Sequence, residues 1–166
     1  MIFRIPEGKH YALPWRFGLW WRRPVFAWTV KFDDTCRYDL GTEDQFDTNK
    51  LIGVGYLPHH HTGSARFGWR YWPDTGQIEL SAYCYVDKRR VIYHIALVEI
   101  GRRYRLHLSV TTMAYVFSVE DIEDERAMGG CSIPHFHRKK LQYRLGAYFG
   151  GNSVAPHEMN VQIEKH

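Results

Sequence analysis

The chain has 166 residues, 45% of them hydrophobic and 16% aromatic, and this content excludes intrinsic disorder as a global state. Its formal net charge of +4 is compatible with anionic partners, but 18 interspersed acidic residues leave no dominant basic tract. The three cysteines lie far apart, which argues against a disulfide framework and a structural zinc site.

A chain of this length most simply forms one domain, 1–166, and buries roughly 70% of the surface that its unfolded form exposes. The first 14 residues contain no apolar signal-peptide core, and no stretch approaches the roughly 18 apolar residues of a membrane-spanning helix. We therefore expect no membrane segment, and a cytoplasmic location if the chain start is native.

Apolar and polar residues alternate along most of the chain, which is the pattern of half-buried strands. The predicted strands lie, in chain order, within 3–10, 26–32, 51–57, 64–71, 77–85, 91–97, 103–110, 113–119, 143–149 and 157–164. Cys84 alternates with apolar residues, so we interpret it as part of the core. About ten short strands, each with one apolar face, predict an all-β protein: an antiparallel two-sheet β-sandwich.

Helical periodicity is nearly absent. The one helix candidate is the charged segment 121–128, which is long enough for a single turn. Long loops are expected at 39–49 and 128–140. The second loop ends in the basic run 137–140, which, like the basic spot at 20–23, is interpreted as a solvated loop.

The two ends of the chain carry the first resemblance. Phe3–His10 opens as a short strand, Met159–Glu164 closes as another, and the pairing of first and last strands is common in jelly-roll sandwiches. With the strand count, the chain resembles a small member of the concanavalin A-like lectin/glucanase superfamily. The resemblance implies a jelly-roll fold over most of the chain.

A second resemblance is local. The segment Arg144-Leu145-Gly146-Ala147-Tyr148 resembles the Lys-Ala-Gly-x-Tyr strand of alginate-lyase-type polysaccharide lyases. In that family the Tyr serves in acid/base chemistry beside a basic residue, so the resemblance implies this role for Tyr148, with Arg144 in place of the Lys. The family's Arg-Thr-Glu-Leu and Gln-Ile-His strands are absent from this chain. If the protein is a lyase, His60 is the candidate partner base.

The outward faces of the predicted strands collect guanidinium and ring side chains. We take seven of these as candidate ligand-binding residues: Arg66, Arg70, Trp72, Tyr83, Tyr85, Arg144 and Tyr148. Glu79 lies on the same outward faces. Arginine binds carboxylates with two parallel hydrogen bonds, and aromatic rings suit the apolar faces of sugars. If the strands share one sheet, these residues line one groove. The alternative is a solvated face covered by side chains that lie flat.

Metal ligands are harder to assemble from this sequence. On an extended segment His59, His60 and His61 point to opposite sides, so at most two converge on one metal, and a third ligand must come from afar. The distant candidates are His135, His137 and His157. The acidic loop, with Asp39, Glu43, Asp44, Asp47 and Asn49, offers oxygen ligands without EF-hand spacing. We assign no metal or cofactor and leave calcium open.

Glu79 is the only acidic residue within the central predicted strands, and the E-x-D-x-x-E cluster of glucanases is missing. Enzyme activity is left open, with a lyase favoured over a glycoside hydrolase. We predict a lectin-like, carbohydrate-binding protein whose ligand is a polysaccharide or oligosaccharide, including an acidic one. The alternatives are a polysaccharide lyase and a structural or partner-binding module. Nucleic-acid binding is disfavoured because no ribonucleoprotein motif is present, and the oligomeric state is left open.

Overall fold

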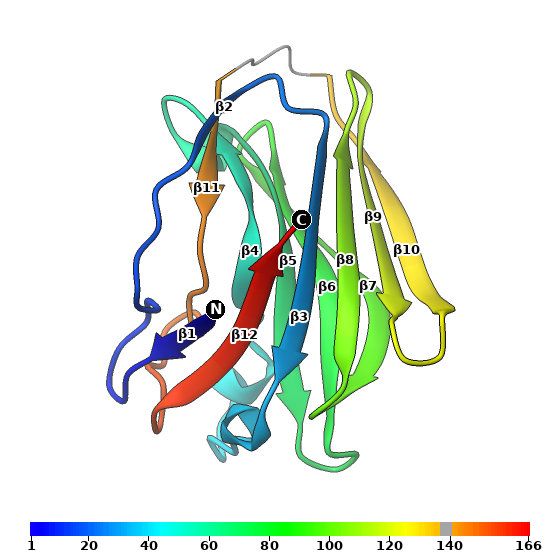
Figure 1. The fold of residues 1–166 in the computed structure, drawn as a ribbon. Helices are drawn as coiled ribbons and strands as arrows, with labels where there is room; N and C mark the ends of the chain where they lie inside the picture. The colour runs from blue at the N-terminus through cyan, green and yellow to red at the C-terminus, as the bar shows by residue number, and fades with distance from the viewer. Residues whose placement is uncertain (137–140) are drawn as a thin grey trace.

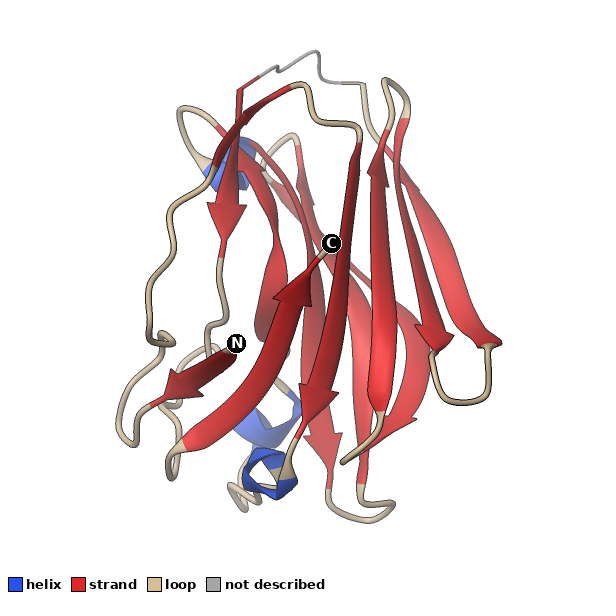
Figure 2. Ribbon diagram, in the orientation of Figure 1, coloured by secondary structure: helices blue, strands red, loops and turns tan. Residues whose placement is uncertain are grey.

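The computed structural model describes residues 1–136 and 141–166, so the basic run at 137–140 lies outside the described residues. The described residues form twelve strands in two antiparallel sheets that stack face to face (Figures 1 and 2). Helical structure in this part of the chain is limited to three 3₁₀ turns, η1 (Asp34–Cys36), η2 (Glu43–Phe46) and η3 (His60–Thr62). The predicted all-β, two-sheet sandwich is confirmed, with twelve strands rather than about ten.

Each sheet has six strands. The first sheet has the order β1 (Ile2–Ile5), β12 (Met159–Lys165), β3 (Val25–Phe32), β8 (Arg103–Val110), β9 (Ala114–Asp121) and β10 (Arg126–Pro134). The second has the order β2 (Leu19–Trp21), β11 (Leu141–Leu145), β4 (Asn49–Tyr56), β5 (Gly63–Trp72), β6 (Gln77–Val86) and β7 (Arg89–Glu99). The first and last strands pair antiparallel, with Ile5 opposite Met159, as the jelly-roll resemblance predicts.

The core lies between the two sheets and is rich in aromatic rings. Trp28 of β3 meets Phe67 of β5 across the sandwich at a ring-centroid distance of 6.4 Å, and Phe67 meets Phe117 of β9 at 5.0 Å. Period-two alternation directs these rings inward, and each fully buried large side chain stabilises the fold by about 1.5–3 kcal/mol. Cys84 is fully buried in this core, as predicted.

Two local predictions are wrong. The segment 121–128 forms no helix, since β9 ends at Asp121, a tight turn follows, and β10 begins at Arg126. The expected loop at 128–140 is strand as far as Pro134. Its Gly129-Gly130 pair reads as a loop signal, yet a Cβ at Gly129 would collide with the carbonyl oxygen of Ile95 in β7. Glycine is needed there because two backbones approach closely.

The strand predicted at 143–149 is interrupted. The ladder of β11 ends at Leu145, and the chain then makes single bridges from Tyr148 to Lys50 and to Tyr11. Its two predicted faces are nevertheless present, because Leu145, Ala147 and Phe149 are buried while Arg144 and Tyr148 are partly exposed. No helical segment in the described residues has the length and apolar character that crossing a bilayer requires.

Candidate functional site

A groove of about 420 Å³ opens on the second sheet, beside the extended segment 6–18 that joins β1 to β2. This segment is called the strap below. Polar and aromatic side chains from several elements line the groove: Tyr11, Trp15 and Arg16 of the strap, Lys50 of β4, His60 and His61 of η3, Arg66 of β5, Tyr83 and Tyr85 of β6, Arg144 of β11, and Tyr148. The groove therefore gathers residues from both ends of the chain, from Phe3 to Gly151.

Strand register brings these residues together. Arg66 lies opposite Tyr83 of β6 and opposite Gly53 of β4. A Cβ at Gly53 would collide with Arg66, so glycine leaves room for the arginine. Lys50 pairs with Tyr148 through two backbone hydrogen bonds of 2.7 and 2.9 Å. Five of the seven candidate ligand-binding residues line this groove, together with the candidate base His60.

Arg70 and Trp72 lie elsewhere. They share the outward side of β5 with Arg66, but Arg70 is four residues farther along, which is about 13 Å in a strand. There Arg70 donates two hydrogen bonds to Glu79, of 3.1 and 2.9 Å, and Trp72 donates one of 2.9 Å. Arg70 also donates to the carbonyl of Phe46 at 2.8 Å. These residues bind one another outside the groove.

Arg66 is the most unusual residue of the groove. Among the described residues its buried Nε has no hydrogen-bond partner, and no carboxylate forms an ion pair with its guanidinium. The guanidinium carbon lies 5.6 Å from the centre of the Tyr83 ring. Burial lowers the pKa of Arg66 to about 10, while nearby tyrosines act in the opposite direction. A desolvated cation without a counter-charge is energetically unfavourable.

Lys50 is a second cation next to Arg66. Its Nζ donates a hydrogen bond of 2.6 Å to the carbonyl of Gly150 and lies 5.2 Å from the Tyr83 ring centre and 5.4 Å from that of Tyr148. Burial, followed by the charge of Arg66, lowers the pKa of Lys50 to about 8. Sequence reasoning missed Lys50 because the apolar run of β4 begins one residue later, although its register with Tyr148 places it in the groove.

The groove carries a strong excess of positive charge. Arg16, Lys50, Arg66 and Arg144 all line it, and no aspartate or glutamate is among its described lining residues. The pKa of Arg144 is lowered first by burial and then by the charge of Arg16. The Arg144 guanidinium lies 5.2 Å from the Phe3 ring centre. Such a surface favours an anionic ligand.

The three adjacent histidines are arranged differently from the prediction. His60 and His61 belong to the turn η3 and His59 is its N-cap, so the expectation that the three point to opposite sides of an extended segment is wrong: their ring centroids lie 4.3–4.9 Å apart. His60 makes a 3.2 Å hydrogen bond with the hydroxyl of Tyr143. Burial, and then Arg66, lowers the pKa of His60 to about 4, so its imidazole is neutral at neutral pH. The ring of His61 packs against that of Tyr85, with the two ring centroids 4.6 Å apart.

The distant histidines do not extend this cluster. His157 donates to the carbonyl of Thr35 at 2.8 Å, and His135 packs against Tyr115 at 4.1 Å. His137 lies outside the described residues. Within the described residues, no group of three His, Cys, Asp or Glu side chains is arranged to hold a metal ion, the acidic loop 39–49 included.

Tyr148 is held in place at the groove wall. Its ring stacks on that of His10, with centroids 5.0 Å apart and planes 7° from parallel. His10 in turn makes a 3.0 Å hydrogen bond with the carbonyl of Phe149. These contacts hold the phenol ring of Tyr148 in place beside Lys50.

No family model and no curated protein matches the sequence. An alginate lyase from Klebsiella pneumoniae aligns with 86% of this chain at a TM-score of 0.66 and 9% identity. An alginate lyase from Pseudomonas aeruginosa aligns with 87% of this chain at a TM-score of 0.59 and 9% identity. A functionally unknown protein from Saccharomyces cerevisiae aligns with 90% of this chain at a TM-score of 0.55 and 9% identity.

The chain has the β-sandwich fold of the alginate lyases. It covers 59% of the Klebsiella enzyme, 64% of the Pseudomonas enzyme and 72% of the yeast protein. At these identities the likeness establishes the fold alone. The concanavalin A-like fold suggested by the sequence is in accord with these neighbours.

Proposed function

We propose that the groove binds an acidic carbohydrate, in particular an oligosaccharide that contains uronate residues. The observation that carries this proposal is the partly buried Arg66, whose Nε is buried without a hydrogen-bond partner and whose guanidinium, close to Lys50, pairs with no carboxylate of the described residues. A ligand carboxylate would supply that counter-charge. Arginine offers a planar fork that matches a carboxylate, and the ammonium of Lys50 adds a point charge.

The rings of the groove favour a sugar over a small inorganic anion. Tyr85 and Tyr148 present ring faces with a hydroxyl at one end, which suits a pyranose that is apolar on its faces and polar at its edge, whereas Tyr83 is buried and lies against Lys50 and Arg66. A volume of about 420 Å³ lies within the usual range of about 300–1,000 Å³ for small-ligand sites. The fold shared with two alginate lyases agrees with a carbohydrate ligand without identifying it.

Titration calorimetry with uronate oligosaccharides and with neutral oligosaccharides of the same length tests the proposal. We expect the acidic series to bind and Arg66→Met to weaken its affinity by at least about tenfold, since a charged hydrogen-bond pair contributes about 1.5–3 kcal/mol. Arg70→Met is the matched control, because Arg70 lies on the same strand outside the groove. Its affinity should stay within about twofold of the parent protein.

Two results would reject the proposal. If neither series binds, the groove does not serve acidic sugars, and a partner-binding module becomes the better hypothesis. If neutral and acidic oligosaccharides bind equally well and Arg66→Met changes nothing, the cations do not determine recognition.

A second candidate function is β-elimination in a polyuronate, and it rests on the presence of neutral His60 and Tyr148 in the same groove. In this reaction a base removes the proton next to the carboxyl group, a carbon–carbon double bond forms, and the glycosidic oxygen leaves with a proton. Absorbance of the unsaturated product should then rise with time. Tyr148→Phe should abolish this rise but keep most of the affinity for the polyuronate. If the parent protein forms no unsaturated product, the elimination is rejected and binding remains as the proposed function.

A further inference from the structure

Exposed apolar side chains form a stripe along the strap and β2. Every second residue from 11 to 21 is large, apolar and exposed: Tyr11, Leu13, Trp15, Phe17, Leu19 and Trp21. Trp15 is 72% exposed and Phe17 68%. Large aromatic residues are rarely left in contact with water in such a row unless the surface has a binding role.

The stripe is held in a fixed position. Leu13 exchanges two backbone hydrogen bonds of 2.7 Å with Arg4, Ala12 donates one of 3.2 Å to Ala147, and Gly18 accepts one of 2.9 Å from Arg144. On the opposite side of the segment, the Trp20 ring packs edge-on against Phe26 in the interior, at 5.1 Å. Backbone hydrogen bonds therefore hold the strap at residues 12, 13 and 18, on both sides of Trp15 and Phe17.

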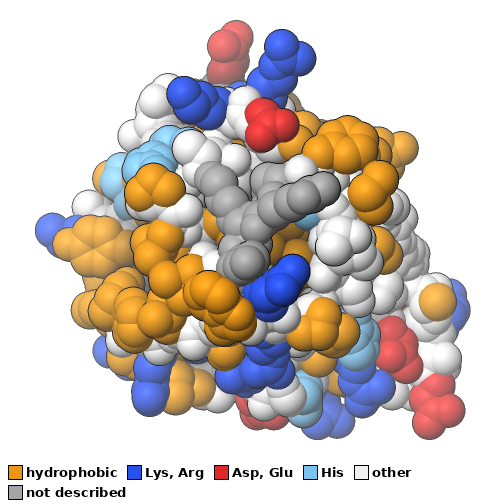
Figure 3. Space-filling model, turned by 90° about the horizontal axis from the view of Figure 1, so that it is seen from above, with side chains coloured by type: hydrophobic (Ala, Val, Ile, Leu, Met, Phe, Trp, Pro, Cys, Tyr) orange, Lys and Arg blue, Asp and Glu red, His pale blue; other side chains and the backbone are white. Residues whose placement is uncertain are grey.

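The stripe is continuous with the groove. Tyr11, Trp15 and Arg16 belong to the strap and also line the groove, and the rings of Trp15 and Phe17 lie 6.2 Å apart. Figure 3 shows hydrophobic side chains gathered in a continuous patch on one side of the molecule, with Lys and Arg side chains at its border. A polymer that leaves the groove along the strap would meet aromatic rings that alternate with the positive charge of Arg16.

We propose that Trp15 and Phe17 form a stacking subsite for sugar residues beyond those bound by Arg66 and Lys50. The ligand would be an acidic polysaccharide longer than the groove, with its rings on the two aromatic side chains and a carboxylate near Arg16. This inference rests on the proposed function of the groove and adds where the polymer continues. Its signature is an affinity that increases with oligosaccharide length.

The experiment measures the affinity of uronate oligosaccharides of increasing length for the parent protein and for the double variant Trp15→Ala/Phe17→Ala. Stacking contributions of about 0.5–1.5 kcal/mol per ring predict a loss of roughly fivefold or more for the longest oligosaccharides. Because Trp15 also lines the groove, the matched test on the shortest ligands that still bind is Phe17→Ala alone, which should lower their affinity by less than about twofold. Tyr93→Ala is the control, because Tyr93 is an aromatic residue of β7 that is 60% exposed and does not line the groove.

The outcomes separate this inference from the function on which it rests. If the parent protein binds no acidic oligosaccharide of any length, both are rejected. If it binds them and the double variant shows the same length dependence, only the stacking subsite is rejected. A loss of self-association or of sedimentation with anionic lipid vesicles in the double variant, with unchanged sugar binding, would assign the stripe to another occupant and reject the subsite.

Discussion

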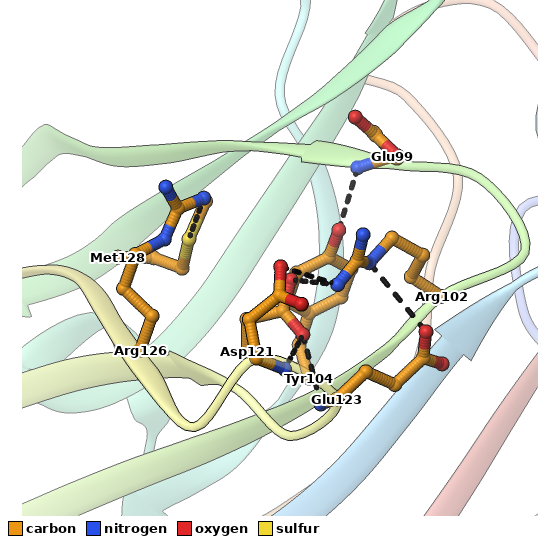
Figure 4. Close-up of polar contacts among 8 residues, drawn as sticks. Glu99, Arg102, Tyr104, Asp121, Glu123, Arg126 and Met128 are labelled. Atoms are coloured by element: carbon orange, nitrogen blue, oxygen red, sulfur yellow. Dashed lines mark hydrogen bonds and ion pairs between the residues drawn. The ribbon is translucent and has the colours of Figure 1, made fainter.

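Two arginines of this chain have opposite surroundings. Arg102, between β7 and β8, places its Nη2 at 2.9 Å from Asp121 and 2.7 Å from Asp124, and its Nε at 3.7 Å from Glu123 (Figure 4). Arg66 in the groove has no such carboxylate among the described residues. The first arrangement is complete within the chain, whereas for the second we propose that a ligand supplies the negative charge.

The pKa values follow the same contrast. Hydrogen bonding to Asp121 raises the pKa of Arg102, whereas burial lowers the pKa of Arg66. The Arg102 site also anchors the hairpin through Asp121, whose carboxylate accepts backbone hydrogen bonds from Glu123 at 3.0 Å and Asp124 at 3.4 Å. We infer that the fold is stabilised by charges that are paired, and that recognition uses a charge that is left unpaired.

The largest expected effect is on stability at the paired site. Arg102→Met leaves the carboxylate of Asp121 without its cation and should lower the free energy of unfolding. Because Arg102 is partly exposed, this loss in the free energy of unfolding should be smaller than the loss caused by breaking a fully buried ion pair. Urea denaturation followed by fluorescence measures it.

Arg66→Met should behave in the opposite way in the same denaturation experiment. It removes a desolvated charge with no partner, so the free energy of unfolding should stay constant or rise, although ligand affinity falls. Equal destabilisation by the two variants would remove the contrast between the sites and show that Arg66 supports the fold.

A smaller effect is expected from pH. With a pKa of about 8, Lys50 loses its charge as pH rises, so affinity for an acidic ligand should fall about five- to tenfold between about pH 7 and pH 9. Without ligand the sign reverses: the unfolded chain keeps this proton up to a pKa near 10.5, so the contribution of Lys50 to stability rises across that window. Calorimetry and thermal unfolding at several pH values measure both effects.

Lys50→Arg is the control for the pH experiment, because a guanidinium stays charged over this range. The affinity of this variant should be nearly independent of pH. If it declines with pH as the parent protein does, the titrating group is another residue, and Lys50 does not contact the ligand.

Alternation in the sequence predicts most of the fold. The inward residues of β3, β5 and β6 repeat with period two and are buried as expected, and the sequence ends suggest the pairing of β1 with β12. One failure occurs where glycine has a second meaning. Gly129 indicates a loop when considered alone, but it is required by the close approach of β10 to β7, a contact distant in sequence.

The site is less predictable because a period of two identifies a face but gives no position along it. Arg66 and Arg70 share one face of β5, yet the groove covers only the end near Arg66, and Arg70 turns to Glu79. Lys50 and Arg16 reach the groove through strand register and the path of the strap, which no local pattern indicates.

The close contact of β10 with β7 determines where the two sheets of the sandwich can separate. At that seam the two sheets meet backbone to backbone, where Gly129 leaves no space beside Ile95. At the opposite edge, β1 of the first sheet and β2 of the second are joined by the strap (Figure 1). A few backbone hydrogen bonds hold the strap to its neighbours. Separation of the two sheets should therefore begin at this edge, beside the groove, so that ligand entry and local opening of the sandwich are coupled.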